Sequence, residues 1–134
     1  MPKVILLIED ETDIRAVYKE LLTDVGYSVI EASDGDIGLE RALNSNWDLL
    51  LLDVMLPKRD GLEILSKIKT NETIKDKPVI LLSNLEKGDI LKACMELGAK
   101  NFLIKSNIVP QDLLDEVTLH LGVRADEQQP EYNL

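Results

Sequence analysis

Short apolar segments and stretches of helical periodicity alternate along this chain from end to end. The apolar segments are residues 3–8, 28–32, 49–53, 79–83 and 101–104. Segments of that length and composition are typical of buried strands, whereas apolar residues spaced three or four positions apart are typical of helices that bury one face. Strands that alternate with helices indicate a parallel sheet, because parallel neighbours need a crossover connection between them.

The helical stretches also carry start and stop signals. The clearest one places apolar side chains from Ile14 to Val25 on one stripe and ends at Gly26, a residue that often terminates helices. The last one opens at Pro110 and stops at Gly122. Three further helices are predicted: one at residues 34–43, one that begins near Leu62 and is ended by Asn71, and one that begins near Ile90 and is ended by Gly98. We therefore predict an α/β fold, a doubly wound (βα)5 parallel sheet with the flavodoxin-like strand order 2-1-3-4-5.

Length and composition describe one acidic domain. The 134 residues fit a single domain, which we assign to residues 1–122, and the polar, aperiodic residues 123–134 are expected to form a short C-terminal tail. A net charge of −10 argues against direct nucleic-acid binding. Without an apolar stretch near the ~18 residues of a membrane span, we expect no membrane insertion. One cysteine, Cys94, fits a reducing, cytoplasmic setting.

Carboxylates follow two of the predicted strands. Asp53 ends the apolar run at residues 49–52, and Glu9 and Asp10 follow the first strand. An unpaired carboxylate is too costly to bury in a core, so Asp53 is expected at the carboxyl edge of the sheet, where open α/β sheets bind ligands. Carboxylates without a nearby His or Cys favour a hard cation such as Mg²⁺. The sequence therefore predicts a metal-binding pocket shared by the two strand ends.

Two further polar residues are expected at the same edge. Ser83 ends the fourth strand and is followed by Asn84, and Lys105 follows the fifth strand. Taken singly, Ser83 could cap a helix and Lys105 could be a solvated strand end. Together with a carboxylate nucleophile they suit phosphoryl transfer, in which Asp53 would form an aspartyl-phosphate while Lys105 and Ser83 bind phosphoryl oxygens.

Several of these motifs have a familiar arrangement. The segments are Asp53–Gly61 (DVMLPKRDG) and Gly98–Lys105 (GAKNFLIK), with the acidic pair Glu9-Asp10 and the hydroxyl of Ser83. Over residues 3–121 the chain resembles the receiver domain of two-component response regulators. With no output domain after it, we expect a stand-alone regulator of this type.

The resemblance implies roles for individual residues. Asp53 would be the phosphoacceptor, with Ser83 and Phe102 as the switch residues and Lys105 as the phosphoryl-binding cation. The implied Mg²⁺ ligands are Asp10, Asp53 and the backbone carbonyl of Met55, with Glu9 acting mainly through water.

Three positions depart from the usual pattern of this family. Ser106 stands where Pro usually follows the lysine, so a cis X-Pro bond is not available, and a cis bond without Pro costs about 3 kcal/mol. Asn84 replaces a small residue, and we expect it to modulate water access to the phosphoryl group. Phe102 replaces the commoner Tyr and lacks its hydroxyl, although its packing can still switch.

The resemblance implies a signalling protein rather than an enzyme, with catalysis limited to its own phosphotransfer and autodephosphorylation. The donor would be the phosphohistidine of a sensor histidine kinase or a histidine phosphotransfer protein. Phosphorylation would change the face formed by the fourth helix, fifth strand and fifth helix, which would bind an unknown downstream protein, relay the phosphoryl group or form a homodimer. The alternative is a phosphorylation-independent, receiver-like binding module. An aspartate-nucleophile phosphatase would need a second acid where Met55 stands.

Overall fold

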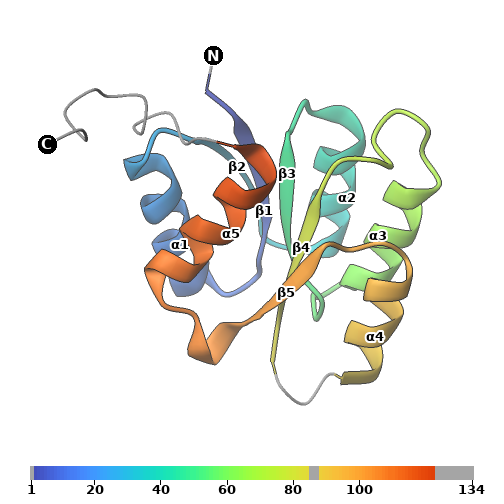
Figure 1. The fold of residues 1–134 in the computed structure, drawn as a ribbon. Helices are drawn as coiled ribbons and strands as arrows, with labels where there is room; N and C mark the ends of the chain where they lie inside the picture. Colours follow the sequence, from blue (N-terminus) through green and yellow to red (C-terminus); the bar gives the residue numbers. More distant parts are fainter. Residues whose placement is uncertain (1, 85–87, 123–134) are drawn as a thin grey trace, which may run out of the picture.

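A computed structural model describes residues 2–84 and 88–122, and within them strands and helices alternate as predicted (Figure 1). The strands are β1 Val4–Ile8, β2 Ser28–Ala32, β3 Leu49–Asp53, β4 Val79–Ser83 and β5 Asn101–Ile104. The helices are α1 Thr12–Asp24, α2 Gly35–Asn44, α3 Gly61–Lys69, α4 Gly88–Glu96 and α5 Pro110–Leu121, with the short 3-10 helix η2 at Lys105–Asn107. All pairings are parallel in the order β2-β1-β3-β4-β5, which confirms the predicted fold and strand order.

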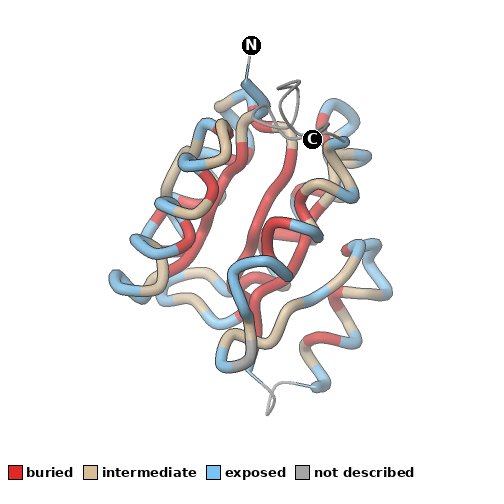
Figure 2. The backbone as a smooth tube through the Cα atoms, turned by 60° about the vertical axis from the view of Figure 1, so that its left-hand side comes forward, coloured by how far each residue is buried: buried red, intermediate tan, exposed pale blue. Residues whose placement is uncertain are grey.

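Two layers of helices enclose the sheet, with α1 and α5 on one face and α2, α3 and α4 on the other (Figure 1). The side chains of each strand alternate between the two faces. Ile5 and Leu7 therefore pack in the cluster under α1 and α5, whereas Leu6 and Ile8 pack in the cluster under α2, α3 and α4. β3 and β4 are buried along their whole length, as expected for central strands of a parallel sheet (Figure 2).

Side chains at the carboxyl edge of the sheet begin two of the helices. Asp34 accepts a hydrogen bond from the Ile37 backbone N–H at 2.8 Å at the start of α2, and Asp60 accepts one from the Glu63 N–H at 2.9 Å at the start of α3. Such N-caps satisfy backbone donors that a helix leaves free. α3 and α4 end just before Asn71 and Gly98, the residues predicted to stop them, whereas α4 begins at Gly88, two residues before the predicted Ile90.

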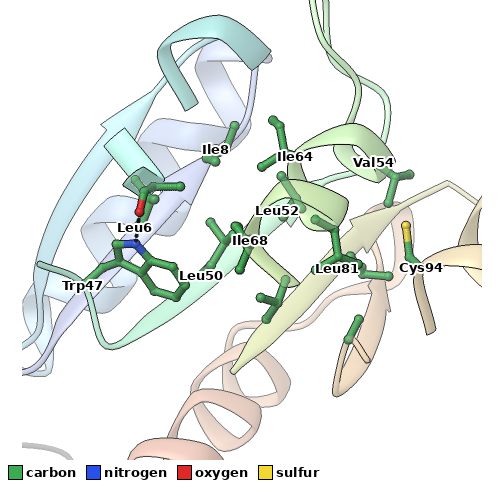
Figure 3. Packing of buried hydrophobic residues seen from close by; sticks show 14 of the residues in the cluster. Leu6, Ile8, Trp47, Leu50, Leu52, Val54, Ile64, Ile68, Leu81 and Cys94 are labelled. Atoms are coloured by element: carbon green, nitrogen blue, oxygen red, sulfur yellow. Dashed lines mark hydrogen bonds between the residues drawn. The ribbon is translucent and has the colours of Figure 1, made fainter. Parts of the chain in front are cut away.

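Trp47, which precedes β3, lies at the opposite end of the sheet, where the strands begin. Its side chain is fully buried in the cluster shown in Figure 3, and its Nε1–H donates to the Ala42 carbonyl oxygen at 3.0 Å. The Lys77 ammonium lies 5.0 Å from the indole centroid and donates to the Trp47 carbonyl oxygen at 2.7 Å. These contacts hold the residue before β3 in place, and the pairing of β3 with β1 and β4 sets the register that places Asp53 at the other end.

No helix among residues 2–84 and 88–122 is long and apolar enough to span a bilayer. The predicted tail at 123–134 lies outside the described residues.

Candidate functional site

The parallel register brings the predicted strand-end residues to one edge. Asp53 is the last residue of β3, Glu9 follows β1 directly, and Ser83 ends β4. Lys105 follows β5 as the first residue of η2. Three of these residues are almost fully buried, with Glu9 0%, Asp53 2% and Ser83 1% exposed. Groups this polar are rarely buried without partners, so their contacts define the site.

Lys105 is the cation at the centre of the site. Its Nζ lies 3.1 Å from Asp53 Oδ2 and 3.1 Å from the Glu9 carboxylate. A third carboxylate, that of Glu11, reaches the same ammonium at 3.1 Å from the solvent side. One buried lysine therefore faces two buried carboxylates and one exposed carboxylate. The absence of Pro after Lys105 does not misdirect its side chain, which reaches Asp53 from the 3-10 helix.

Backbone amides hold the two buried carboxylates in place. The Met55 N–H donates to Asp53 Oδ1 at 3.0 Å, and the Glu11 N–H donates to Glu9 Oε2 at 2.9 Å. Glu9 Oε1 is buried without a hydrogen bond among the residues that the structure describes, although the Lys105 ammonium is within ion-pair distance. An oxygen of this kind is one a cation or its bound water can use.

The acidic residues fit a divalent cation. Glu9, Asp10 and Asp53 each offer one carboxylate oxygen, and these three atoms lie within 4.8 Å of one another. Asp10 is more accessible to solvent than the other two carboxylates. An all-oxygen donor set with one open side suits Mg²⁺, which keeps several of its waters and takes only a few protein ligands.

Burial and charge shift the pKa values of the three central groups. Burial raises the pKa of Glu9 to about 7, against the lowering effect of the Glu11 N–H, and the negative charge of Asp53 adds to the rise. Burial likewise raises the pKa of Asp53, although the Met55 N–H and Lys105 oppose it. Burial alone would lower the pKa of Lys105, but its pairing with Asp53 and Glu9 prevails and raises it. The metal-free site therefore carries carboxylates that resist ionisation beside a lysine that stays charged.

We expect the metal-free protein to lose stability as the pH rises from 5.5 to 7.5. A carboxyl whose pKa is raised in the folded state stabilises the fold below its ordinary pKa of 4.5, and that contribution is lost as the pH passes about 7. For Glu9 the loss amounts to at most about 3 kcal/mol. Glu31 and Asp34, whose pKa values are lowered, act in the opposite sense but only in more acidic solution.

Urea unfolding in EDTA at both pH values measures this effect. The Glu9→Gln variant should show a much flatter dependence between pH 5.5 and 7.5. A wild-type protein that gained stability over this interval would contradict the assignment of a raised pKa to Glu9.

We expect Ser83 and Phe102 to act as a switch, and both lie outside the cluster formed by Lys105 and the carboxylates. The Ser83 hydroxyl donates to the carbonyl oxygen of Asn84 at 2.9 Å, and Asn84 itself is exposed. Phe102 lies on the outer strand β5 and is 39% exposed. Met55 is 41% exposed at its side chain, while its backbone N–H is bonded to Asp53.

Two residues of the site were missed by the sequence reasoning. Glu11 belongs to the acidic run after β1, but its pairing with Lys105 could not be read from that run. Arg15 donates from Nη1 to the Glu9 carbonyl oxygen at 2.8 Å and from Nε to Glu31 on β2 at 3.3 Å. The sequence contained no signal for Arg15, because the contact joins a helix to the backbone of a neighbouring loop.

A five-stranded parallel sheet of order 2-1-3-4-5 with buried acids and a lysine at its carboxyl edge defines the receiver class of α/β proteins. The chain belongs to the response regulator receiver domain family, whose model matches residues 5–118. This family serves two-component signalling, and its members bind Mg²⁺ at an acidic pocket and receive a phosphoryl group from histidine kinases.

Individual relatives agree with this assignment. The transcriptional regulatory protein DltR of Streptococcus agalactiae is 41% identical over 101 residues, which are 75% of this chain and 44% of DltR. A CheY-like receiver domain protein from Methanospirillum hungatei superposes with a TM-score of 0.83 at 28% identity, covering 98% of this chain and 99% of that one. The receiver domain of sensor histidine kinase PA1611 from Pseudomonas aeruginosa, solved with a magnesium ion in its active-site cleft, gives 0.82 at 25% identity, covering 92% and 100%.

The chain thus spans less than half the length of the curated relative DltR. Its likeness to DltR establishes the domain family and leaves the output open.

Proposed function

We propose that Asp53 accepts a phosphoryl group from the phosphohistidine of a sensor histidine kinase or a histidine phosphotransfer protein. The observation that carries this proposal is the buried contact of Asp53 with Lys105, at 3.1 Å, beside the carboxylate of Glu9. In the transfer, an oxygen of Asp53 forms a bond to phosphorus while the bond from phosphorus to the histidine nitrogen breaks. The nitrogen leaves with the bonding electrons and takes up a proton, and an aspartyl-phosphate remains.

The residues that would hold Mg²⁺ are the carboxylates of Asp10 and Asp53 and the backbone carbonyl of Met55, with Glu9 acting through water. The close approach of the three carboxylate oxygens supports this assignment, as does the magnesium ion of the PA1611 receiver domain. When bound, the ion would neutralise part of the negative charge that Asp53 and the phosphoryl group bring together.

Lys105 would bind negatively charged oxygens both before and after phosphoryl transfer. Before transfer its ammonium is paired with Asp53, and after transfer it can bind a phosphoryl oxygen without moving to another site. Ser83 would rotate away from the Asn84 carbonyl and donate its hydroxyl to another phosphoryl oxygen. The site then reacts by positioning and charge neutralisation, which are the main contributions to phosphoryl transfer generally.

The readout we propose is a change in the face formed by α4, β5 and α5. Movement of Ser83 would open space into which Phe102, now partly exposed, could turn. This face would bind a downstream protein, pass the phosphoryl group on or form a homodimer. The chain would catalyse only its own phosphotransfer and dephosphorylation, and the intact set of Asp53, Lys105 and Glu9 counts against the phosphorylation-independent alternative.

Intact-mass measurement after incubation with acetyl phosphate tests this function. With Mg²⁺ we expect the gain of one phosphoryl group, and with EDTA we expect none. If no adduct forms and a Mg²⁺ titration also shows no binding, the phosphorylation-independent module becomes the better interpretation.

We expect Asn84→Ala to shorten the lifetime of the aspartyl-phosphate. Asn84 is exposed next to Ser83, where its amide would shade the phosphoryl group from attacking water. A threefold faster hydrolysis corresponds to a barrier lowered by about 0.7 kcal/mol. The decay of the phosphorylated mass after removal of acetyl phosphate measures the rate, with Asn44→Ala, an exposed position on α2, as the control. An unchanged rate would exclude a role of Asn84 in water access.

A further inference from the structure

The loop between β3 and α3, residues 54–60, is fastened by backbone hydrogen bonds from three elements. The Val54 N–H donates to the Leu82 carbonyl of β4 at 3.1 Å, and the Gly61 N–H of α3 donates to the Val54 carbonyl at 3.0 Å. In the middle of the loop, the Pro57 carbonyl accepts a hydrogen bond from the Gly35 N–H of α2 at 3.1 Å. The first two bonds secure the beginning of the loop, whereas α2 alone among these elements holds its middle.

Gly35 permits this contact because it has no side chain. A Cβ atom at Gly35 would lie 1.8 Å from the backbone oxygen of Arg59 and 2.6 Å from the Cβ of Arg59. Contacts this short with backbone atoms force one element to move. Gly88, the first residue of α4, has nothing within 4 Å of the same hypothetical atom. Gly61, the first residue of α3, is also tight, since its Cβ would lie 2.7 Å from the Asp53 backbone oxygen. The close approach is therefore shared by the two helices that pack on this loop, and α4 lacks it.

Ion pairs reinforce the same contact. Arg59 Nε lies 3.2 Å from Asp36 in the first turn of α2, and Arg59 Nη1 binds Glu63 in the first turn of α3. Lys58, whose φ is 71°, directs its ammonium to within 3.6 Å of Asp34. Exposed pairs contribute little to stability singly. Their effect here is geometric, because Arg59 joins the loop to two helices at once.

Met55 and Leu56 lie between the anchored residues Val54 and Pro57. The Met55 N–H is bonded to Asp53 Oδ1, so the same peptide segment touches the phosphoacceptor carboxylate. With both ends of a two-residue span fixed, the direction of the Met55 carbonyl follows from where α2 holds Pro57. A change at Gly35 or Arg59 would therefore reach the site through the backbone, without either residue touching it.

We propose that the first turn of α2 positions the Met55 carbonyl for Mg²⁺, with Gly35 and Arg59 as positioning residues. The inference rests on the proposed function, because it takes the Met55 carbonyl as a magnesium ligand. Beyond that function, the inference states that the contact between α2 and the β3–α3 loop sets the affinity for the cation. Supporting contacts behind metal ligands commonly change affinity by factors of about 10 to 100.

A Mg²⁺ titration of ¹⁵N-labelled protein, followed by amide NMR shifts, tests the inference. We expect Gly35→Ala to raise the Mg²⁺ dissociation constant about tenfold, at the lower end of that range. The matched control is Gly88→Ala, a glycine-to-alanine change at a helix start with open space around it, and its dissociation constant should equal that of the wild type. Equal affinities for Gly35→Ala and the wild type would overturn the inference.

Arg59 variants serve if Gly35→Ala does not fold. Arg59→Ala should raise the dissociation constant about threefold, a smaller change because its ion pairs are partly exposed. Arg59→Lys, which keeps one cation for Asp36, should restore part of the affinity. Urea unfolding in EDTA distinguishes a purely structural role from a positioning role. A variant that is less stable but binds Mg²⁺ as tightly as the wild type would refute the positioning role.

The wild-type titration distinguishes a failure of the positioning role from a failure of the proposed metal site. If the wild type binds Mg²⁺ and the variants bind it equally well, the positioning role fails while the proposed function stands. If the wild type does not bind Mg²⁺, the proposed metal site fails and the inference fails with it.

Discussion

Asp53→Asn is expected to abolish the phosphoryl adduct and, in the same protein, to stabilise the metal-free fold. The adduct is lost because an amide oxygen is a poor nucleophile compared with a carboxylate. The gain in stability arises because burial raises the pKa of Asp53, so the ionised carboxylate costs free energy at pH 7.5. The neutral amide removes that cost, and Lys105 keeps its ion pair with Glu9. We expect an increase in the free energy of unfolding, because one buried carboxylate instead of two then faces the single Lys105 ammonium.

Two measurements check this result. Intact mass after incubation with acetyl phosphate and Mg²⁺ reports the adduct, and urea unfolding in EDTA reports the stability. Asp112→Asn, an exposed position in the first turn of α5, is the matched control and should leave both unchanged. An adduct that persists in Asp53→Asn would place the phosphoacceptor elsewhere. A loss of stability would show that the pairing of Asp53 with Lys105 outweighs its burial.

The sequence predicts the strands of this fold better than the helix starts. β2 to β5 match their predicted ranges, since a short apolar run bounded by polar residues leaves a buried strand little freedom. α1 and α4 each begin two residues before the first apolar residue of the predicted stripe, at Thr12 and Gly88. Gly98, with a φ of 111°, ends α4 as predicted, and its N–H bonds back to the Met95 carbonyl oxygen.

At the site, the sequence predicts which residues meet but not how they are bonded. Parallel strand order is enough to bring Glu9, Asp53 and Lys105 together, and the structure confirms that they meet. The bond from Ser83 to Asn84 and the contact of Arg15 with the Glu9 carbonyl depend on side-chain rotamers and helix placement. No local sequence pattern predicts either contact, so both are known only from the structure.

The contact between α2 and the β3–α3 loop shows the same limit. Gly35 and Arg59 are 24 positions apart, and nothing in their local sequence links them. Only the strand order and the path of the loop make the backbone oxygen of Arg59 the neighbour of Gly35. A glycine next to a capping Asp would ordinarily be read as part of a turn.

Lys105→Met is expected to cause the largest loss of stability of any single change at the site. The lysine side chain is 6% exposed and faces the carboxylates of Glu9 and Asp53, whose side chains are 0% and 3% exposed. Removing one member of a buried ionic cluster leaves the others uncompensated, at a cost of about 3–5 kcal/mol. Urea unfolding in EDTA at pH 7.5 measures the loss. The control is Lys67→Met, which removes an exposed lysine from α3 and should change stability only slightly.

Magnesium should reverse part of this loss, and that reversal separates the charge from the packing of Lys105. Without the ammonium, the carboxylates of Glu9 and Asp53 attract a divalent cation more strongly, so Lys105→Met should bind Mg²⁺ more tightly than the wild type while forming less phosphoryl adduct. Adding Asp53→Asn removes one of the two unpaired buried charges, so it should stabilise Lys105→Met by more than it stabilises the wild type. A double variant whose stability loss equals the sum of the two single changes would show no coupling between Asp53 and Lys105. Their ion pair would then not be what holds the acids in the buried site.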